Sequence, residues 1–242
     1  MFEFYMDAHM HFDLYENRDE VLKYIESKKS YTIAVTNLPD LFQKYIKEYK
    51  DKKFVQFALG FHPELVMEYK NQQAIFKQLV DETRFIGEIG LDFTNISDRE
   101  KDDQMAVFQN ILSWCTDKKK ILSIHSRAAS KEVIAMLDGF NGKVILHWYS
   151  GRIVDLETAI SKGYYLSINH QMIESENGRR IVHKIPVDRI LIESDAPFTK
   201  GLKREYSLFF NDKVYQYLAN RYNQSIDMVK KRIKANFAEV LK

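Results

Sequence analysis

The sequence predicts an α/β fold of the (β/α)8 barrel type, with some distortion and an additional C-terminal helix. Eight short apolar runs alternate with longer amphipathic stretches along the 242 residues, and about 250 residues is the usual length of such a barrel. An open, doubly wound sheet is the alternative fold. That fold usually carries a glycine-rich phosphate turn after its first strand, whereas the first apolar run here leads into DAHMHFD, which contains no glycine.

The eight apolar runs are predicted to be the strands of the barrel. Each run is short and is followed by a stretch whose apolar residues recur with helical spacing. The predicted strands cover residues 2–7, 31–37, 54–60, 84–90, 121–125, 143–147, 164–169 and 189–195. Their order along the chain, each followed by a helix, is that of a barrel built from successive βα units.

The predicted helices alternate with these strands. Asn17, Pro39 and Ser225 occupy positions typical of helix starts. The predicted helices cover residues 17–28, 38–50, 71–82, 98–118, 129–138, 152–162, 174–183, 205–220 and 225–241. Two of them follow the eighth strand, so the last is the additional C-terminal helix. No linker rich in proline or glycine interrupts the pattern, and residues 1–242 are therefore predicted to form one barrel domain.

Composition excludes several other classes of protein. The chain is 45% hydrophobic and 13% aromatic with a net charge of +2, which excludes a disordered or strongly basic protein. The single cysteine, Cys115, excludes an internal disulfide framework and is typical of a reducing compartment. We find no apolar stretch long enough to span a membrane and no basic, apolar leader at the N-terminus. These features predict a cytoplasmic location.

Ionisable side chains fall at the ends of most predicted strands, where a barrel places its active site. His9 and His11 are separated by one residue, so they would leave a strand toward the same side. Five of the seven histidines lie at or just beyond a predicted strand end. The set comprises His9, His11, His62, Glu88, His125, His147 and Asp195. A lone histidine of this kind is usually structural, but this many on one rim predict a metal site.

The donor set indicates which metal ions would bind. Imidazole together with carboxylate suits Zn²⁺, Mn²⁺, Ni²⁺ or Fe²⁺, and Mg²⁺ where carboxylates and phosphates dominate. Six candidate ligands exceed what one catalytic ion needs when a position stays open for water. Two divalent ions that share one carboxylate fit the set better.

Six motifs, in this order and spacing, resemble the TatD-type metal-dependent deoxyribonucleases of the amidohydrolase superfamily. They are MDAHMHFD, GFHP, GEIGLD, ILSIHSR, ILHWYSG and LIESDAPF. The resemblance covers essentially the whole chain. More narrowly, the sequence is similar to the TatD-type nuclease component of the four-gene Qat antiphage defence system. That similarity implies a role in antiphage defence and the other Qat proteins as partners.

The resemblance also implies a role for each strand-end residue. It assigns one metal ion to His9, His11 and Asp195, a second ion to His125 and His147, and the bridge between them to Glu88. His62 would contact the scissile phosphate or protonate the leaving oxygen. Asp195 would also orient the attacking water and accept its proton. The chain departs from the family pattern at Ala128, where an acidic residue is frequent, and in TKGLKREYSL, which lacks proline.

Other residues near the strand ends are candidates for contact with DNA. Arg127 suits a phosphate clamp, because guanidinium binds phosphate oxygens in pairs; a salt bridge on the rim is the alternative. Lys200, Lys203 and Arg204 could attract the DNA backbone or form a plain solvated loop. The aromatic residues Phe61, Trp148 and Tyr149 could stack on unpaired bases or seal the barrel mouth by packing. Stacking would favour single strands or frayed 3′ ends.

The sequence thus predicts a metal-dependent DNase, specifically a 3′→5′ exonuclease with two divalent metal ions (Mg²⁺, Mn²⁺ or Zn²⁺) and DNA as its substrate. Two alternatives remain open. One is an amidohydrolase-type enzyme that acts on a small molecule; relatives of that kind often bridge their metals with a carboxylated lysine, whereas Glu88 occupies that region here. The other is a DNA-sensing subunit of a defence complex, which would not need an intact set of metal ligands.

Overall fold

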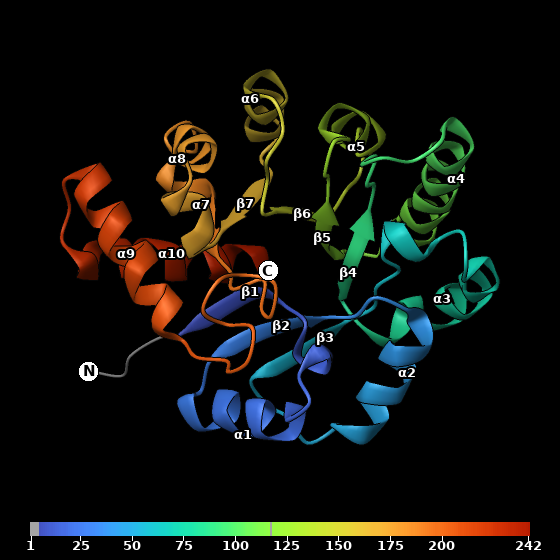
Figure 1. The fold of residues 1–242 in the computed structure, drawn as a ribbon, viewed down its shortest axis with the longest axis horizontal. Coiled ribbons are helices and arrows are strands. Elements are labelled where there is room, and N and C mark those ends of the chain that lie inside the picture. The colour runs from blue at the N-terminus through green and yellow to red at the C-terminus, as the bar shows by residue number, and fades with distance from the viewer. Residues whose placement is uncertain (1–4, 117) are drawn as a thin grey trace.

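The computed structural model describes residues 5–116 and 118–242 and confirms the predicted (β/α)8 barrel. Figure 1 shows the strands around a central axis with helices on the outside. The strands are β1 (Met6–Met10), β2 (Tyr31–Val35), β3 (Val55–Ala58), β4 (Phe85–Gly90), β5 (Ile121–His125), β6 (Lys143–His147), β7 (Tyr165–Ile168) and β8 (Ile190–Ile192). Nearly every strand residue is buried, as expected for parallel strands covered by helices.

The barrel is distorted, because its strands form two parallel sheets instead of one continuous ring. One sheet has the order β1-β2-β3 and the other β4-β5-β6-β7-β8. A bridge between Leu59 and Ile86 joins the sheets on one side, where Phe61 N also donates to Glu88 O at 2.9 Å. On the other side, Asp195 N donates to His9 O at 2.9 Å and His11 N donates to Ala196 O at 2.8 Å. Residues of the strand ends therefore close the ring between β8 and β1.

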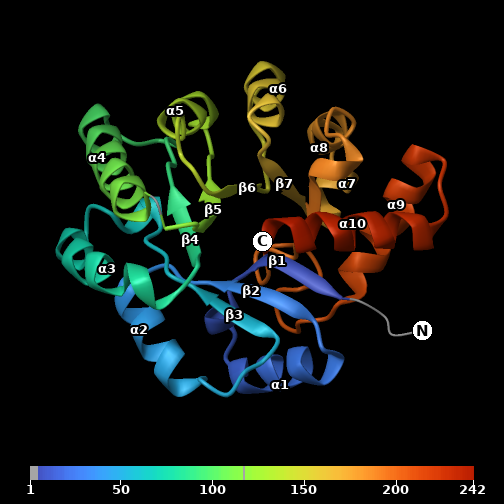
Figure 2. The same ribbon diagram turned by 180° about the vertical axis from the view of Figure 1, so that it is seen from behind.

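The helices surround the barrel, and two of them follow β8 (Figures 1 and 2). Serine caps begin two of the longest, since Ser97 and Ser225 accept hydrogen bonds from backbone N–H groups of the first turn. The helices are α1 (Arg18–Lys28), α2 (Pro39–Glu48), α3 (Gln73–Leu79), α4 (Asp98–Cys115), α5 (Ser130–Met136), α6 (Ile153–Ser161), α7 (His170–Glu174), α8 (Glu176–Val182), α9 (Phe209–Tyr222) and α10 (Ile226–Val240). In the described part of the chain, none could cross a membrane by its length and apolarity.

Three predicted boundaries were wrong. The first strand was expected over 2–7, but β1 runs from Met6 to Met10, and residues 2–4 lie outside the described part. Polar side chains at positions 7 and 9 suggested a strand end, whereas both are buried in the barrel. The helix expected over 174–183 begins two residues later as α8 (Glu176–Val182), because Ser175 ends the preceding helix α7 (His170–Glu174), which was not predicted, and caps α8. The helix expected from residue 205 begins at Phe209.

Candidate metal centre

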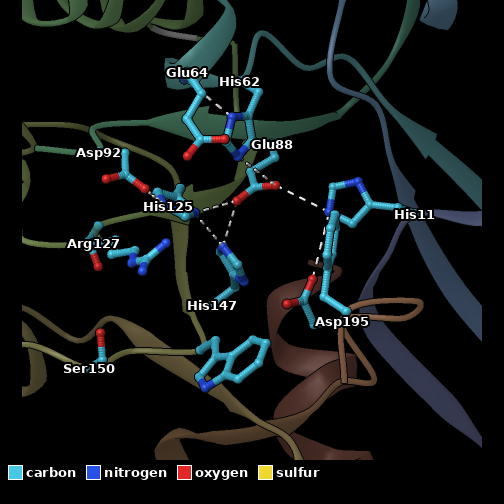
Figure 3. Close-up of a pocket in the computed structure, with 13 residues that line it drawn as sticks. His11, His62, Glu64, Glu88, Asp92, His125, Arg127, His147, Ser150 and Asp195 are labelled. Carbon is cyan, nitrogen blue, oxygen red and sulfur yellow. Dashed lines mark hydrogen bonds and ion pairs between the residues drawn. The ribbon is translucent and has the colours of Figure 1, made fainter. Parts of the chain in front are cut away.

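Glu88 lies at the centre of the strand-end cluster and contacts histidines on both sides (Figure 3). Its Oε1 atom is 2.7 Å from His125 Nδ1 and 2.7 Å from His147 Nε2. Its Oε2 atom is 3.2 Å from His11 Nε2 and 3.6 Å from His9 Nε2. The two oxygens of one carboxylate therefore face two separate pairs of ring nitrogens. One pair comes from β1 and the residue just after it, and the other pair comes from the ends of β5 and β6.

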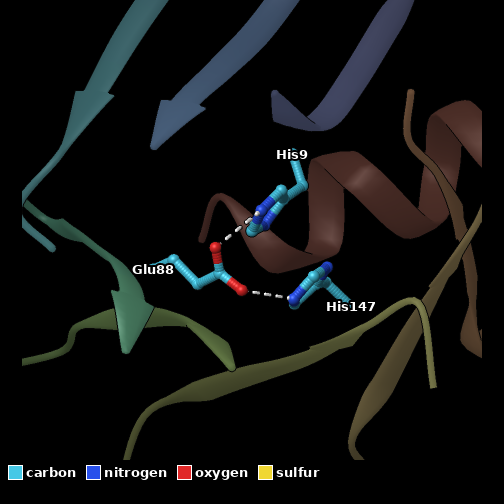
Figure 4. A group of neighbouring side chains, drawn as sticks. All are labelled: His9, Glu88 and His147. Carbon is cyan, nitrogen blue, oxygen red and sulfur yellow. Dashed lines mark hydrogen bonds and ion pairs between the residues drawn. The ribbon is translucent and has the colours of Figure 1, made fainter. Parts of the chain in front are cut away.

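The first cluster joins the two ends of the strand ring. The Nε2 atoms of His9 and His11 are 3.3 Å apart, and Asp195 Oδ1 lies 3.7 Å and 3.6 Å from them. His9 sits inside β1, where its ring stacks on His147 with centroids 3.9 Å apart. Figure 4 shows one oxygen of the Glu88 carboxylate directed toward His9 and the other toward His147. The three ligand atoms of His9, His11 and Asp195 lie close enough to share one ion.

The second cluster is formed by His125 and His147, at the ends of β5 and β6. His125 Nδ1 and His147 Nε2 are 3.3 Å apart, and both contact the same oxygen of Glu88. Two ring nitrogens so close, turned toward one carboxylate oxygen, are poised to share a cation. His125 and His147 are the last residues of the neighbouring parallel strands β5 and β6. Because Ile124 pairs with Leu146, the two side chains lie side by side.

Burial and neighbouring charges shift the pKa values of the residues around Glu88 in both directions. Burial lowers the pKa of His9 well below its ordinary value and also lowers that of His147, so both rings are neutral donors. Burial would raise the pKa of Glu88, but the surrounding histidines hold it well below its ordinary value. Burial, together with the nearby carboxylates Glu193 and Glu88, raises the pKa of Asp195 well above its ordinary value.

The residues present fit a bound divalent cation. Three groups of three ligand atoms could each hold one: His9 with Glu88 and His147, His9 with His11 and Asp195, and His62 with Glu88 and His125. Asp195 Oδ1 is buried and has no hydrogen-bond partner among the described residues. A buried carboxylate oxygen without a partner is costly unless a cation is bound to it. Neutral imidazole nitrogens and carboxylate oxygens are ligands that Zn²⁺ and Mn²⁺ accept. Glu88 offers one oxygen to each cluster, so it can bridge two ions.

Side chains behind the ligands orient two of the histidine rings. Ser123 Oγ lies 2.7 Å from His9 Nδ1 and can accept a hydrogen bond from the protonated Nδ1. The lone pair of Nε2 then faces the cluster. Asp92 Oδ2 lies 2.9 Å from His125 Nε2 and leaves Nδ1 free in the same way. Sequence reasoning missed both residues. Asp92 ends the GEIGLD motif, so the motif itself carried that signal.

Two further buried carboxylates near the site were also missed. Glu193 accepts hydrogen bonds from Ser167, from Asn169 Nδ2 at 3.2 Å and from Trp148 N at 2.9 Å. Asp7 accepts from Ser194 N and from the Tyr206 hydroxyl, each at 2.8 Å, and burial raises its pKa to about 6. Both lie two residues before a predicted ligand, and this spacing in a strand was the available signal.

A cavity of about 460 Å³ opens above the cluster. Its floor is made of predicted ligands, and its walls include residues that the sequence did not single out. The lining residues are His11, His62, Glu64, Glu88, Asp92, His125, Ser126, Arg127, His147, Trp148, Ser150, Asp195 and Phe198. Figure 3 shows that His62 and Arg127 reach the cavity from different sides.

Two of the three aromatic candidates for stacking are packed in the interior, as the alternative prediction had it. Phe61 and Tyr149 are each only 1% exposed, so neither ring offers an open face to a base. The chain turns at the end of β6, so that Trp148 lines the cavity while Tyr149 points into the core, where its hydroxyl donates to Arg152 O at 2.7 Å. Lys203 and Arg204 are exposed but are not among the described residues that line the cavity, and their contact with DNA stays a prediction.

The fold and the site together define a metal-dependent hydrolase barrel. The chain belongs to the TatD family, because the model of TatD-related DNases matches residues 6–242. Two solved structures share the fold over nearly their whole length. A TatD homologue from Escherichia coli superposes with a TM-score of 0.83 at 18% identity, covering 98% of this chain and 97% of that one. A TatD-family hydrolase from Entamoeba histolytica gives 0.79 at 15% identity, covering 98% and 97%.

Relatives by sequence carry hydrolase descriptions. An uncharacterized metal-dependent hydrolase from Buchnera aphidicola is 26% identical and aligns over 88% of this chain and 87% of its own length. An uncharacterized metal-dependent hydrolase from Methanocaldococcus jannaschii is 29% identical, with 83% of each chain covered. The comparisons confirm the predicted class of enzyme, a TatD-family metal-dependent hydrolase.

Metal affinity is expected to rise with pH. Burial would lower the pKa of His125, but Glu88 and Asp92 raise it to about 9 in the metal-free protein. Below pH 9 an entering ion must therefore displace the proton of this ring, at a cost of about tenfold in affinity per pH unit. A competition titration of Zn²⁺ against a chromophoric chelator, from pH 6.5 to 9, measures this slope.

The variant Asp92→Asn is the matched control for this slope. It removes one of the groups that raise the pKa of His125, so its affinity should level off at a lower pH than that of the unmodified protein. The same levelling pH in both proteins, or an affinity that is flat below pH 9, would contradict the assignment of His125 as a ligand.

Proposed function

We propose that this TatD-family hydrolase is a DNase that cleaves phosphodiester bonds, acting as a 3′→5′ exonuclease on single strands or frayed ends. The observation that carries the proposal is Glu88 between two pairs of ring nitrogens at the floor of an open cavity. Membership of the TatD-related DNases supports DNA as the substrate. We also propose that residues 1–242 act as one domain and that the protein is located in the cytoplasm.

Two bound divalent cations would supply an activated water at neutral pH and would neutralise charge on the phosphate. His9, His11 and Asp195 would hold one ion and His125 and His147 the other, with Glu88 between them. Asp195 is proposed to orient the water and to accept its proton, a role supported by its buried and unpartnered Oδ1 atom.

His62 is proposed to donate a proton or hydrogen bond to the leaving oxygen. Its Nδ1 atom accepts the backbone N–H of Glu64 at 3.3 Å, so we place the proton of the neutral ring on Nε2. Nε2 faces the centre, 3.5 Å from Glu88 Oε2. A donor at this place lies on the cavity side of the bridging carboxylate, where a phosphate would enter.

Arg127 is proposed to bind a phosphate of the DNA backbone, because its exposed side chain lines the same cavity as His62 and His125. Replacing it with alanine should raise the KM for single-stranded DNA about tenfold and reduce the salt slope of binding by about one. Binding by fluorescence anisotropy at several salt concentrations measures both. The control variant Arg127→Lys keeps the charge and should retain most of the salt slope of binding. An unchanged salt slope in Arg127→Ala would contradict the proposed contact between Arg127 and a phosphate.

The decisive test is cleavage of end-labelled single- and double-stranded DNA by the purified protein with Mg²⁺, Mn²⁺ or Zn²⁺. We expect metal-dependent laddering from the 3′ end, faster on single strands than on blunt duplex. Laddering from the 5′ end would overturn the polarity, and equal rates on both substrates would overturn the strand preference. No cleavage by protein that binds about two ions would favour a small-molecule substrate.

A role in antiphage defence, together with the other proteins of a Qat system, is the finer part of this proposal. It is supported by the overall similarity and the compact length that the sequence shares with the nuclease component of that system. Plaque counts on cells that carry the whole four-gene set, with this chain intact or with Glu88→Ala, test the role. Equal plaque numbers in the two strains would overturn it.

A further inference from the structure

Phe198 is a large apolar side chain left open to solvent beside the metal centre. It is 59% exposed and lines the cavity. Its backbone N–H donates to Asp195 O at 2.9 Å, which fixes the residue against the ligand loop. Its ring stands edge to face with the ring of His11, at a centroid distance of 5.2 Å. An exposed aromatic ring held this close to a catalytic centre is available to a ligand.

Trp148 provides a second aromatic wall of the same cavity. Its backbone has a φ of 35°, in the left-handed region that non-glycine residues rarely adopt. The buried carboxylate of Glu193 accepts its N–H at 2.9 Å and holds this conformation from beneath. The backbone that carries the indole is therefore held by a buried group of the core.

Apart from Ser150, which follows β6, the polar side chains of the lining outside the proposed ligands follow β3, β4 and β5. Arg127 and its neighbour Ser126 follow β5, and Glu64 and His62 follow β3, whereas Trp148 follows β6 and Phe198 follows β8. Figure 3 shows Arg127 and Glu64 on other sides of the centre than Asp195. One part of the cavity thus offers charge and hydrogen bonds and the other offers aromatic faces. This division matches a nucleotide, which has an anionic phosphate and a flat, apolar base.

We propose that Phe198, with Trp148, forms a subsite for the base of the nucleotide that is cleaved from the strand end. The proposal deepens the proposed function and rests on it. Stacking on an aromatic face requires an unpaired base, and it accepts all four bases because each has a π-face. The subsite therefore accounts for a preference for single strands without any reading of sequence.

The test combines a change in the protein with a change in the substrate. Phe198→Ala should lower kcat/KM on single-stranded DNA about tenfold. It should cause no further loss on a strand whose 3′-terminal nucleotide is abasic, because the interaction is then already absent. Phe209→Ala is the matched control, since Phe209 is an exposed phenylalanine at the start of α9 that does not line the cavity. It should behave as the unmodified protein on both strands.

A spectroscopic measurement reports the stacking itself. A strand with 2-aminopurine at its 3′ terminus should lose fluorescence when it binds the slow variant Asp195→Asn. The loss should disappear in the double variant Asp195→Asn, Phe198→Ala. An equal loss of kcat/KM on intact and abasic strands, or unchanged quenching, would overturn the subsite. Failure of the unmodified protein to cleave any DNA would instead overturn the proposed function, and the subsite with it.

Discussion

Replacing Glu88 with alanine should remove bound metal from both clusters and abolish hydrolysis. Glu88 offers one oxygen to each pair of ring nitrogens, so its loss leaves each cluster short of a ligand. Removal of a residue that only hydrogen-bonds to a metal ligand costs about 10–100-fold in metal affinity or activity. Because Glu88 is proposed to be a ligand itself, the loss of metal affinity in Glu88→Ala should exceed that range. Metal content per chain by mass spectrometry, together with the cleavage rate, measures the effect.

The control for this variant is Glu64→Ala. Glu64 lines the same cavity but belongs to none of the close groups of candidate ligands in the described residues. It should keep about the metal content of the unmodified protein. If Glu88→Ala kept both ions, the bridging role would be wrong; if it lost the ions but still hydrolysed DNA, the centre would not be the active site.

Replacing Asp195 with asparagine should reduce kcat strongly while DNA binding changes little. Asparagine keeps the size of the side chain but cannot accept a proton, and positioned general bases contribute about 10²–10⁴-fold to rate. The Nε2 atoms of His9 and His11 and the Oε2 atom of Glu88 remain to hold an ion. Single-turnover cleavage separates the chemical step from binding, and anisotropy gives the dissociation constant.

Asp212→Asn, an exposed change on α9, controls for the general effect of losing a negative charge. It should leave both kcat and binding as they are. Two results would count against the role of Asp195. An unchanged kcat would exclude it as the base, and a parallel loss of metal and activity would make it a ligand only.

The fold and most of the centre could be predicted because they depend on repeated local patterns. Most strand ends carried a candidate site residue, and a barrel brings all these ends to one face. The structure does bring His9, His11, Glu88, His125, His147 and Asp195 together. The limits of β1 could not be predicted, because polar residues that point into a barrel look like the end of an apolar run.

The walls of the cavity were harder to predict than its floor. The chain turns at Trp148, whose φ is 35°, so Trp148 lines the cavity and Tyr149 enters the core. The sequence does not reveal such a turn in the backbone after the end of a strand. Asp92 and Phe198 stand in quoted motifs, but their contacts with His125 and His11 join segments far apart in the chain. Such pairings depend on loop geometry.

The closure between β8 and β1 has a consequence for the lifetime of the protein in a cell. The backbone groups of His9, His11 and Asp195 that close the ring belong to the residues proposed to bind one ion. A ligand that binds only the closed form stabilises it by RT ln(1 + [L]/Kd), about 4 kcal/mol at a thousandfold excess over Kd. Scarcity of divalent ions would therefore shorten the survival of the chain against proteases, and would lower its abundance as well as its turnover.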